Sequence, residues 1–243
     1  MKPITLLLVE GVLDRIFYEG YIARALGGKE IGDLKAVPEA LRNVLSASDR
    51  ILRIGVKVFE LYDSLVVLAG CGGFDNLKRM LRELLRRSDE LIRGGLRKIV
   101  LVGDADKDVK QSVQGVASSV LGRECRWHGP FIRIETREGV LCLAGVAQGL
   151  VGEGKTSQLE DLIEDLAIKV HADLKRVVET LEKTLKKRLS SKQMVAIFAA
   201  LLARDQSKER LTVELWARAG AREFEQLKRL IPELEEVLNS YCP

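Results

Sequence analysis

The chain is poor in the side chains that support several common kinds of enzyme chemistry. Only two histidines occur among its 243 residues, His128 and His171, and both are far in sequence from the main acidic segments. Their positions argue against nucleophilic catalysis of the Ser-His-Asp type. The four cysteines are scattered without a Cys-x-x-Cys pair, so the sequence indicates neither a zinc site nor a disulfide framework. Any reaction is therefore expected to depend on carboxylates and metal ions.

Long apolar runs are also lacking, whereas charged residues are abundant. The N-terminal segment has one lysine and a short apolar run that stops at Glu10, too short to span a membrane and without a cleavage-site pattern. We therefore expect no membrane partner and a cytoplasmic location. With 47% apolar and 30% charged residues the chain should form a well-packed globular protein, and its net charge of +4 permits a nucleic-acid partner. High charge with little asparagine is typical of thermophile proteins.

Two short apolar runs end at acidic residues beside a glycine. Leu6–Asp14 reads Leu-Leu-Leu-Val-Glu-Gly-Val-Leu-Asp, and Lys98–Asp108 reads Lys-Ile-Val-Leu-Val-Gly-Asp-Ala-Asp-Lys-Asp. An apolar run followed by a helical pattern predicts a buried parallel strand, and open α/β sheets hold ligands at the carboxyl ends of such strands. If the two strands are neighbours, these acidic side chains meet in one crevice: Glu10, Asp14, Asp104, Asp106 and Asp108.

Crowded carboxylates predict a divalent cation, because like charges repel at close range and carboxylate oxygens suit Mg²⁺ or Mn²⁺. Asp104 and Asp106 should point the same way, since alternate residues of an extended segment share a side. Both could then join one metal shell. Asp14 and Asp108 each have an alternative role at the start of a helix, where a carboxylate caps the helix or complements its dipole.

The order and spacing of these motifs resemble the TOPRIM domain of topoisomerases, bacterial-type primases, OLD-family nucleases and the ribonucleases that mature small ribosomal RNA. The carrying motifs are Val-Glu-Gly-x-x-Asp after one strand and Asp-x-Asp after a later one. The segment Val66–Leu77, with a strand, a glycine turn and an asparagine opening a helix, is similar to the OLD branch and to small stand-alone archaeal and bacterial TOPRIM proteins. The resemblance covers about residues 4–165. It implies an α/β fold with a Rossmann-like parallel sheet flanked by helices, and a Mg²⁺-dependent nuclease that acts on DNA or RNA.

The resemblance also implies roles for single residues. The implied catalytic residues are Glu10, Asp104 and Asp106, with Asp14, Asp108 and Glu160 as further metal ligands and Lys155 as a phosphate contact. Glu160 equally fits a capping box, Ser157-Gln-Leu-Glu160, at the start of a helix. OLD proteins usually carry an ATPase domain before TOPRIM, for which this chain has no room. The sequence therefore leaves open whether cleavage requires a protein partner or a homodimer.

Two alternative functions compete with the nuclease. Gly149–Thr156 reads Gly-Leu-Val-Gly-Glu-Gly-Lys-Thr and satisfies the P-loop pattern, in which backbone amides and a lysine bind nucleotide phosphates. P-loop folds need further parallel strands, however, whereas the sequence after Ser157 is helical in pattern. The other alternative is a nucleic-acid-binding module whose acidic site does no chemistry. The basic face of the helix expected from residue 74 to about residue 92 suits a phosphate backbone, although such a face is commonly just solvated.

Apolar periodicity divides the chain into a TOPRIM-like α/β domain at residues 1–156 and a helical C-terminal region at residues 157–243. Strands are expected at Ile4–Val9, Leu65–Ala69 and Ile99–Val102, with a hairpin made by Phe131–Glu135 and Val140–Ala144. Helices are expected at Val12–Leu26, Pro38–Tyr62, Phe74–Ile92, Val109–Leu121, Gln158–Leu189, Lys192–Ala203, Val213–Ala219 and Arg222–Ser240, the last interrupted at Pro232. Gly27–Asp33 is expected to be a connection.

Overall fold

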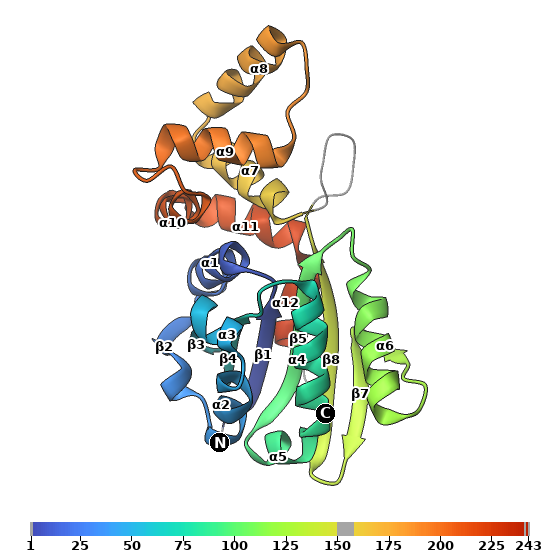
Figure 1. The fold of residues 1–243 in the computed structure, drawn as a ribbon. Coiled ribbons are helices and arrows are strands. Elements are labelled where there is room, and N and C mark those ends of the chain that lie inside the picture. The colour runs from blue at the N-terminus through green and yellow to red at the C-terminus, as the bar shows by residue number, and fades with distance from the viewer. Residues whose placement is uncertain (1, 150–157, 241, 243) are drawn as a thin grey trace.

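A computed structural model describes residues 2–149, 158–240 and 242. Within these residues, eight strands form one mixed sheet at the centre of the α/β part (Figure 1). Their spatial order is β2 (Lys29–Gly32), β3 (Val56–Leu61), β4 (Ser64–Gly70), β1 (Ile4–Val9), β5 (Leu96–Asp104), β8 (Gly139–Gln148), β7 (Phe131–Thr136) and β6 (Trp127–His128).

The four central strands, β4, β1, β5 and β8, run parallel, and an antiparallel pair lies at each side of them. Every residue of β1 is buried: Leu6 and Leu8 belong to the core on one face of the sheet, and Leu7 and Val9 to the core on the other. This burial on both faces explains the unbroken apolar run, because parallel strands are covered by helices on both sides. The predicted neighbourhood of β1 and β5 is confirmed.

Helices cover both faces of the sheet. On one face the core includes residues of α2 (Glu39–Ser46), α3 (Asp49–Ile54), α4 (Phe74–Arg86), α5 (Ser88–Arg93) and α6 (Val109–Leu121). On the other face it includes residues of α1 (Val12–Gly20), the π-helical turn η1 (Tyr21–Ala25) and α12 (Pro232–Asn239). The short 3₁₀ turn η2 (Leu34–Ala36) lies beside β3. The structure thus confirms an α/β fold in which helices flank the sheet.

The remaining helices form a separate layer beyond α1 (Figure 1). They are α7 (Leu159–Val170), α8 (Asp173–Leu185), α9 (Ser191–Leu202), α10 (Lys208–Arg218) and α11 (Ala221–Leu230). Trp216 of α10 packs against Phe17 and Tyr21, with ring centroids 5.4 and 6.5 Å away. The α1 backbone comes so close at Gly20 that an added Cβ would lie 2.3 Å from Cδ1 of Trp216. A glycine is therefore required where the two layers meet.

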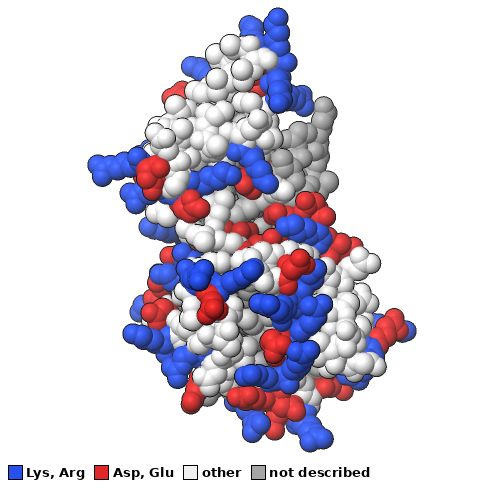
Figure 2. All heavy atoms as spheres, in the orientation of Figure 1, with Lys and Arg blue, Asp and Glu red and all other residues white. Residues whose placement is uncertain are grey.

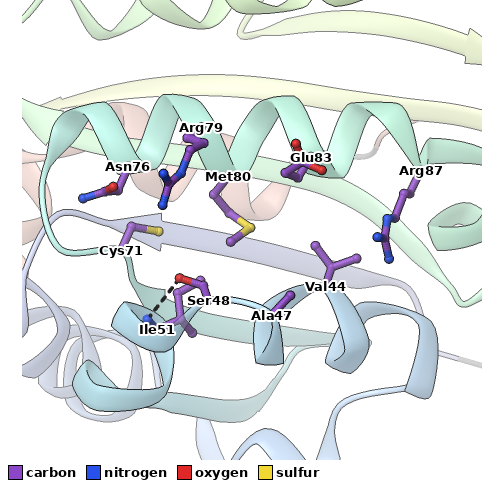
Figure 3. A pocket seen from close by; sticks show the side chains of 10 residues that line it. All are labelled: Val44, Ala47, Ser48, Ile51, Cys71, Asn76, Arg79, Met80, Glu83 and Arg87. Atoms are coloured by element: carbon purple, nitrogen blue, oxygen red, sulfur yellow. Dashed lines mark hydrogen bonds between the residues drawn. The ribbon is translucent and has the colours of Figure 1, made fainter.

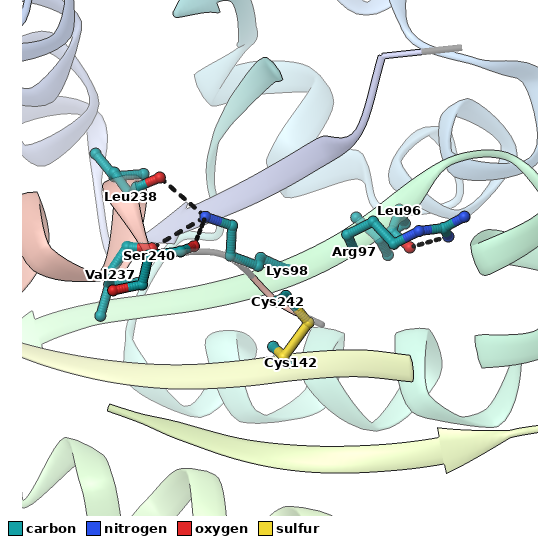
Figure 4. Close-up of a disulfide and its surroundings, with 8 residues drawn as sticks. All are labelled: Leu96, Arg97, Lys98, Cys142, Val237, Leu238, Ser240 and Cys242. Atoms are coloured by element: carbon teal, nitrogen blue, oxygen red, sulfur yellow. Dashed lines mark hydrogen bonds between the residues drawn. A yellow bond between two sulfur atoms is a disulfide. The ribbon is translucent and has the colours of Figure 1, made fainter. Parts of the chain in front are cut away.

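The chain returns to the sheet at α12, and a buried lysine of β5 contacts the C-terminal end of this helix (Figure 4). Lys98 Nζ donates hydrogen bonds to the carbonyl oxygens of Val237, Leu238 and Ser240, at 3.1, 2.9 and 3.0 Å. Burial lowers the pKa of Lys98 to about 8. The ammonium protons satisfy carbonyls that every helix leaves unpaired at its C-terminus.

A disulfide between Cys142 of β8 and Cys242 fastens the same end of the chain to the sheet (Figure 4). The expectation of no disulfide is therefore wrong. The two cysteines are 100 residues apart, so no local spacing motif marks them, and it is the return of α12 to the sheet that brings them together. Cys71 and Cys125 are free and buried.

Three expected helices are wrong in part. Pro38–Tyr62 contains α2, α3 and the strand β3, because Gly55, at φ 98°, ends α3 in a conformation that disfavours other residues. The expected helix from residue 74 to 92 changes direction at Arg87 between α4 and α5. The helix expected from residue 158 to 189 is two helices, α7 and α8.

Two edge strands were missed altogether: the four-residue β2, in the expected connection at residues 27–33, and the two-residue β6. Among the described residues, no helix is both long enough and apolar enough to cross a bilayer.

Candidate functional site

Three neighbouring parallel strands end in polar residues at one edge of the sheet. Glu10 follows β1, Asp104 is the last residue of β5, and Gln148 is the last residue of β8. Asp104 pairs with Gln148 in the register of β5 and β8. Asp14 joins them from the first turn of α1, where its carboxylate accepts a hydrogen bond from the Gly11 N–H at 3.0 Å. Glu10, Asp14 and Asp104 therefore meet in what we call the acidic crevice.

Gln148 is the shared donor of the acidic crevice. Its Nε2 donates to Asp14 Oδ1 at 2.6 Å and to Asp104 Oδ1 at 3.0 Å. The amide oxygen accepts a hydrogen bond from the hydroxyl of buried Tyr18 at 2.9 Å. Because Tyr18 occupies Oε1, the NH₂ group points at the two carboxylates. Gln148 was not predicted as a site residue, although a polar residue at the end of a long apolar strand is a sequence feature that indicates one.

Lys107 supplies a positive charge to the acidic crevice. Its Nζ lies 3.0 and 2.9 Å from the two carboxylate oxygens of Glu10 and 3.6 Å from Asp104 Oδ2. The side chains are partly exposed, at 33% for Lys107, 13% for Glu10 and 17% for Asp104. The crevice is thus open to solvent, and the chain neutralises part of its charge with its own ammonium.

Burial and mutual repulsion govern protonation in the acidic crevice. Burial raises the pKa of Asp14 from 3.8 to about 6, and the charges of Asp104 and Glu10 act in the same direction, against the hydrogen bond from Gln148. Burial also raises the pKa of Asp104. The pKa of Lys107 is raised as well, because its hydrogen bond to Glu10 and the nearby acids outweigh the opposing effect of burial. The three carboxylates of the crevice therefore carry more negative charge than the ammonium group of Lys107 compensates.

The glycine turn after β4 holds the backbone of Glu10. The N–H groups of Gly72 and Gly73 both donate to the Glu10 carbonyl, at 2.6 and 2.8 Å. Their φ angles of +79° and +112° lie in the region that favours glycine. The turn therefore lies against the acidic segment, and its contact is with the backbone of Glu10.

Asp106 lies in a turn and not in an extended segment, so the alternation expected to place it on the side of Asp104 does not apply. The strand ends at Asp104, and residues 104–107 form a turn closed by a hydrogen bond from the Lys107 N–H to the Asp104 carbonyl at 3.0 Å. Asp106 is exposed, and it is Lys107 that reaches Glu10. A metal-ligating role for Asp106 stays a prediction.

The other predicted ligands have different contacts. Asp108 caps α6, where its carboxylate accepts a hydrogen bond from the Gln111 N–H at 3.0 Å. Glu160 forms an ion pair with Lys208 of α10 at 2.9 Å. The capping box of α7 is formed by Gln158 and Asp161, so the box expected at residues 157–160 is wrong by one position.

Lys155 and all but the first residue of the predicted P-loop lie outside the described residues. Only Gly149 of that motif is described. From residue 158 onward, every described element of secondary structure is a helix. That part of the chain therefore contains no parallel strand of the kind that a P-loop fold needs. Phosphate binding by residues 149–156 stays a prediction.

The acidic crevice contains oxygen ligands of the kind that a magnesium ion binds, but these ligands are not arranged to hold one. Carboxylate oxygens suit Mg²⁺ or Mn²⁺. Across residues 2–149, 158–240 and 242, however, no group of three or more Asp, Glu, His or Cys side chains is placed to hold a metal ion. Lys107 Nζ instead contacts both carboxylate oxygens of Glu10. Metal binding requires Glu10 to exchange this ammonium for the ion.

Comparison with known proteins identifies a solved structure with the same fold. No family model matches the chain, and no curated protein matches it. The chain is similar to the crystal structure of hypothetical protein PH0156 from Pyrococcus horikoshii OT3, with a TM-score of 0.74 and 17% sequence identity over 97% of this chain and 98% of that one. At this identity the similarity establishes a shared fold along almost the whole chain.

Proposed function

We propose that this chain is a TOPRIM-type protein that binds Mg²⁺ or Mn²⁺ in the acidic crevice and hydrolyses phosphodiester bonds of nucleic acid. One observation carries the proposal: Glu10, Asp14 and Asp104, from segments distant in sequence, converge at the carboxyl edge of neighbouring parallel strands. Holding Asp14 there opposes folding at neutral pH, because its burial, and to a smaller extent the charges of Asp104 and Glu10, raise its pKa to about 6. Costly charge clusters at a ligand-binding edge are characteristic of functional sites.

The residues of the crevice have distinct roles in this proposal. Glu10, Asp14 and Asp104 would hold the cation, which supplies polarisation of the phosphoryl oxygens and a bound water of lowered pKa. Gln148 keeps Asp14 and Asp104 at a fixed separation by donating to both, and Tyr18 fixes the direction of that amide. These two are positioning residues, since neither would need to touch the substrate.

Lys107 has two roles in succession. Without a ligand it neutralises Glu10 and thereby limits repulsion in the crevice. Once released from Glu10, its ammonium is close to the crevice and free to contact a phosphate of the substrate. The proposal therefore expects Lys107→Met to strengthen Mn²⁺ binding, because the competing cation is gone, and at the same time to weaken cleavage.

Metal binding and cleavage test the proposal with a matched pair of variants. Asp104→Asn removes a carboxylate of the crevice, whereas Asp75→Asn makes the same change at an exposed position of α4 whose carboxylate pairs with Lys78. We expect Asp104→Asn to lower Mn²⁺ affinity, measured by calorimetry, and to abolish Mn²⁺-dependent cutting of plasmid DNA and single-stranded RNA. Asp75→Asn should retain both. The proposal is wrong if wild type binds no Mn²⁺, or if the two variants cut equally well.

A second candidate function is favoured by the ion pair between Lys107 and Glu10. A crevice in which Glu10 is already paired with the chain's own lysine suits a nucleic-acid-binding module that does no chemistry. That module would bind a labelled oligonucleotide equally well in EDTA and in Mn²⁺ and would leave it uncut. The same pair of measurements therefore separates the two candidates.

A further inference from the structure

A cavity of about 320 Å³ opens between α4 and the pair α2 and α3 (Figure 3). Its floor is apolar and consists of side chains that are at least nine-tenths buried: Val44, Ile51, Cys71 and Met80. Cavities that hold small organic ligands begin at about this volume and have this kind of lining, with few polar groups. The space is thus suited to a flat, largely apolar group about as large as a nucleobase.

Two polar side chains that line the cavity each keep a hydrogen-bonding group available for a ligand. Asn76 donates its Nδ2 to the Gly72 carbonyl at 2.6 Å, which fixes the amide and leaves Oδ1 as an acceptor. Ser48 Oγ accepts one bond from the Ile51 N–H at 3.4 Å, so its hydroxyl proton stays available. Both residues line the cavity (Figure 3). A ligand with donors and acceptors on its rim finds partners here.

Two arginines line the cavity without an acidic partner, Arg79 of α4 and Arg87 at the junction of α4 and α5. In the described part of the chain, no ion pair involves Arg79 or Arg87, and both side chains are exposed. Their helix neighbours Lys78 and Arg86, in contrast, pair with Asp75 and Glu83 at 2.7 and 2.6 Å. Figure 2 shows basic side chains gathered over α4 on this face. The cavity is therefore an apolar space beside unpaired guanidinium groups, which bind phosphate well.

The cavity adjoins the acidic crevice through the turn after β4. Cys71 lines the cavity, and its N–H donates to the carbonyl of Val9 at 2.9 Å. The next two residues, Gly72 and Gly73, donate to the carbonyl of Glu10. One turn of three residues thus separates the cavity floor from the predicted metal ligand. The cavity and the crevice therefore lie on either side of the same short turn.

We propose that this cavity is a nucleotide site, with the base against the apolar floor and its phosphate on Arg79. The inference rests on the proposed function in one respect: a strand whose phosphate lies in the acidic crevice presents an adjacent nucleotide to the cavity. Only an unpaired base can leave the stack and enter, so the site selects single strands over duplexes. A free nucleotide shares this chemistry, and the test separates the two sources.

Binding is measured in EDTA, so that it does not depend on metal or cleavage. The probes are a fluorescein-labelled oligothymidylate, the same strand annealed to oligoadenylate, and unlabelled AMP and TMP followed by calorimetry. Arg79→Ser removes the guanidinium beside the cavity, and Arg82→Ser is the matched control, an exposed arginine of the same helix outside the lining. Ala47→Trp fills the cavity from its exposed rim without disturbing the buried floor.

We expect the single strand to bind more tightly than the duplex, and Arg79→Ser to weaken it about tenfold, as for loss of a hydrogen bond to a charged group. Arg82→Ser should weaken it about twofold or less, and Ala47→Trp should abolish the preference for single strands. Binding of AMP or TMP with the same dependence on the variants supports the site with a free nucleotide as its ligand. Equal losses for Arg79→Ser and Arg82→Ser, or no binding of any probe, would overturn the proposal. Loss of Mn²⁺-dependent cleavage alone would count against the nuclease and leave this site standing.

Discussion

Gln148→Leu removes the amide that links two partly buried carboxylates of the acidic crevice. In the wild type, Gln148 donates to Asp14 and to Asp104, and hydrogen bonds to charged groups contribute about 1.5–3 kcal/mol each. Near pH 7.5, where both carboxylates are ionised, the variant should therefore unfold with a free energy lower by about 3–6 kcal/mol. This is a large part of the stability of an ordinary domain.

The loss should depend on pH in a direction set by Asp14. Its pKa is raised from 3.8 to about 6 in the folded protein, so the native state binds more protons than the unfolded state between these values. Stability therefore falls as pH rises from about 4 to above 6. Because the Gln148 hydrogen bond lowers this pKa, the variant should lose stability more steeply and up to higher pH. Below about pH 4.5 a protonated Asp14 accepts only an ordinary hydrogen bond, so the loss should shrink by about 2 kcal/mol.

Urea unfolding of wild type and variant at pH 4.5 and pH 7.5 measures both effects. Tyr18→Phe is the control, since it removes the hydroxyl that orients the Gln148 amide while both carboxylates keep their donor. We expect a loss of about 1–2 kcal/mol for Tyr18→Phe, equal at the two pH values. If Gln148→Leu also loses the same stability at both pH values, the carboxylates do not depend on this amide, and the electrostatic account of the crevice is wrong.

Three further changes test how the layers are joined. Gly20→Ala should destabilise the protein by about 1–3 kcal/mol and change the near-UV circular dichroism of Trp216, because the added methyl group clashes with the indole ring. Gly115→Ala is the control: this glycine lies within α6 with space around it, so alanine should stabilise the protein by about 0.5–1 kcal/mol. Cys242→Ser should lower the free energy of unfolding by about 2–5 kcal/mol, and reducing agent should do the same to the wild type but add nothing to the variant. Lys98→Met leaves three carbonyl oxygens of the C-terminal segment without their donor and should cost about 2–4 kcal/mol in urea unfolding.

Burial on both faces made the central strands predictable. β1 has the predicted bounds, Ile4–Val9, because six consecutive buried positions leave an unbroken apolar run. α6 also has its predicted bounds, since the Asp108 cap begins it and Gly122, at φ 64°, ends it in the left-handed conformation. Where local signals and tertiary packing agree, the sequence alone was sufficient.

The edge of the sheet was not predictable in the same way. β2 has four residues and none is buried, so it lacks the apolar pattern from which strands are recognised. β3 has buried apolar residues on both faces of the sheet, and these residues also fit the end of a helix that begins at residue 38. Only pairing with β4 decides between these possibilities, and that contact lies outside any local window.

The acidic crevice shows why a motif can be placed correctly while its charge balance is misjudged. Glu10 and Asp104 were expected to meet because parallel strands end at one edge, and that rule depends on strand order alone. Asp106 and Lys107 follow different physics: they lie beyond the last strand residue, where a turn ends the alternation of side chains and directs the lysine to Glu10. The predicted metal site therefore already holds a cation of its own. In the proposed function, a divalent ion must bind the crevice more favourably than this ammonium does, so Lys107 would set a lower limit on the metal affinity.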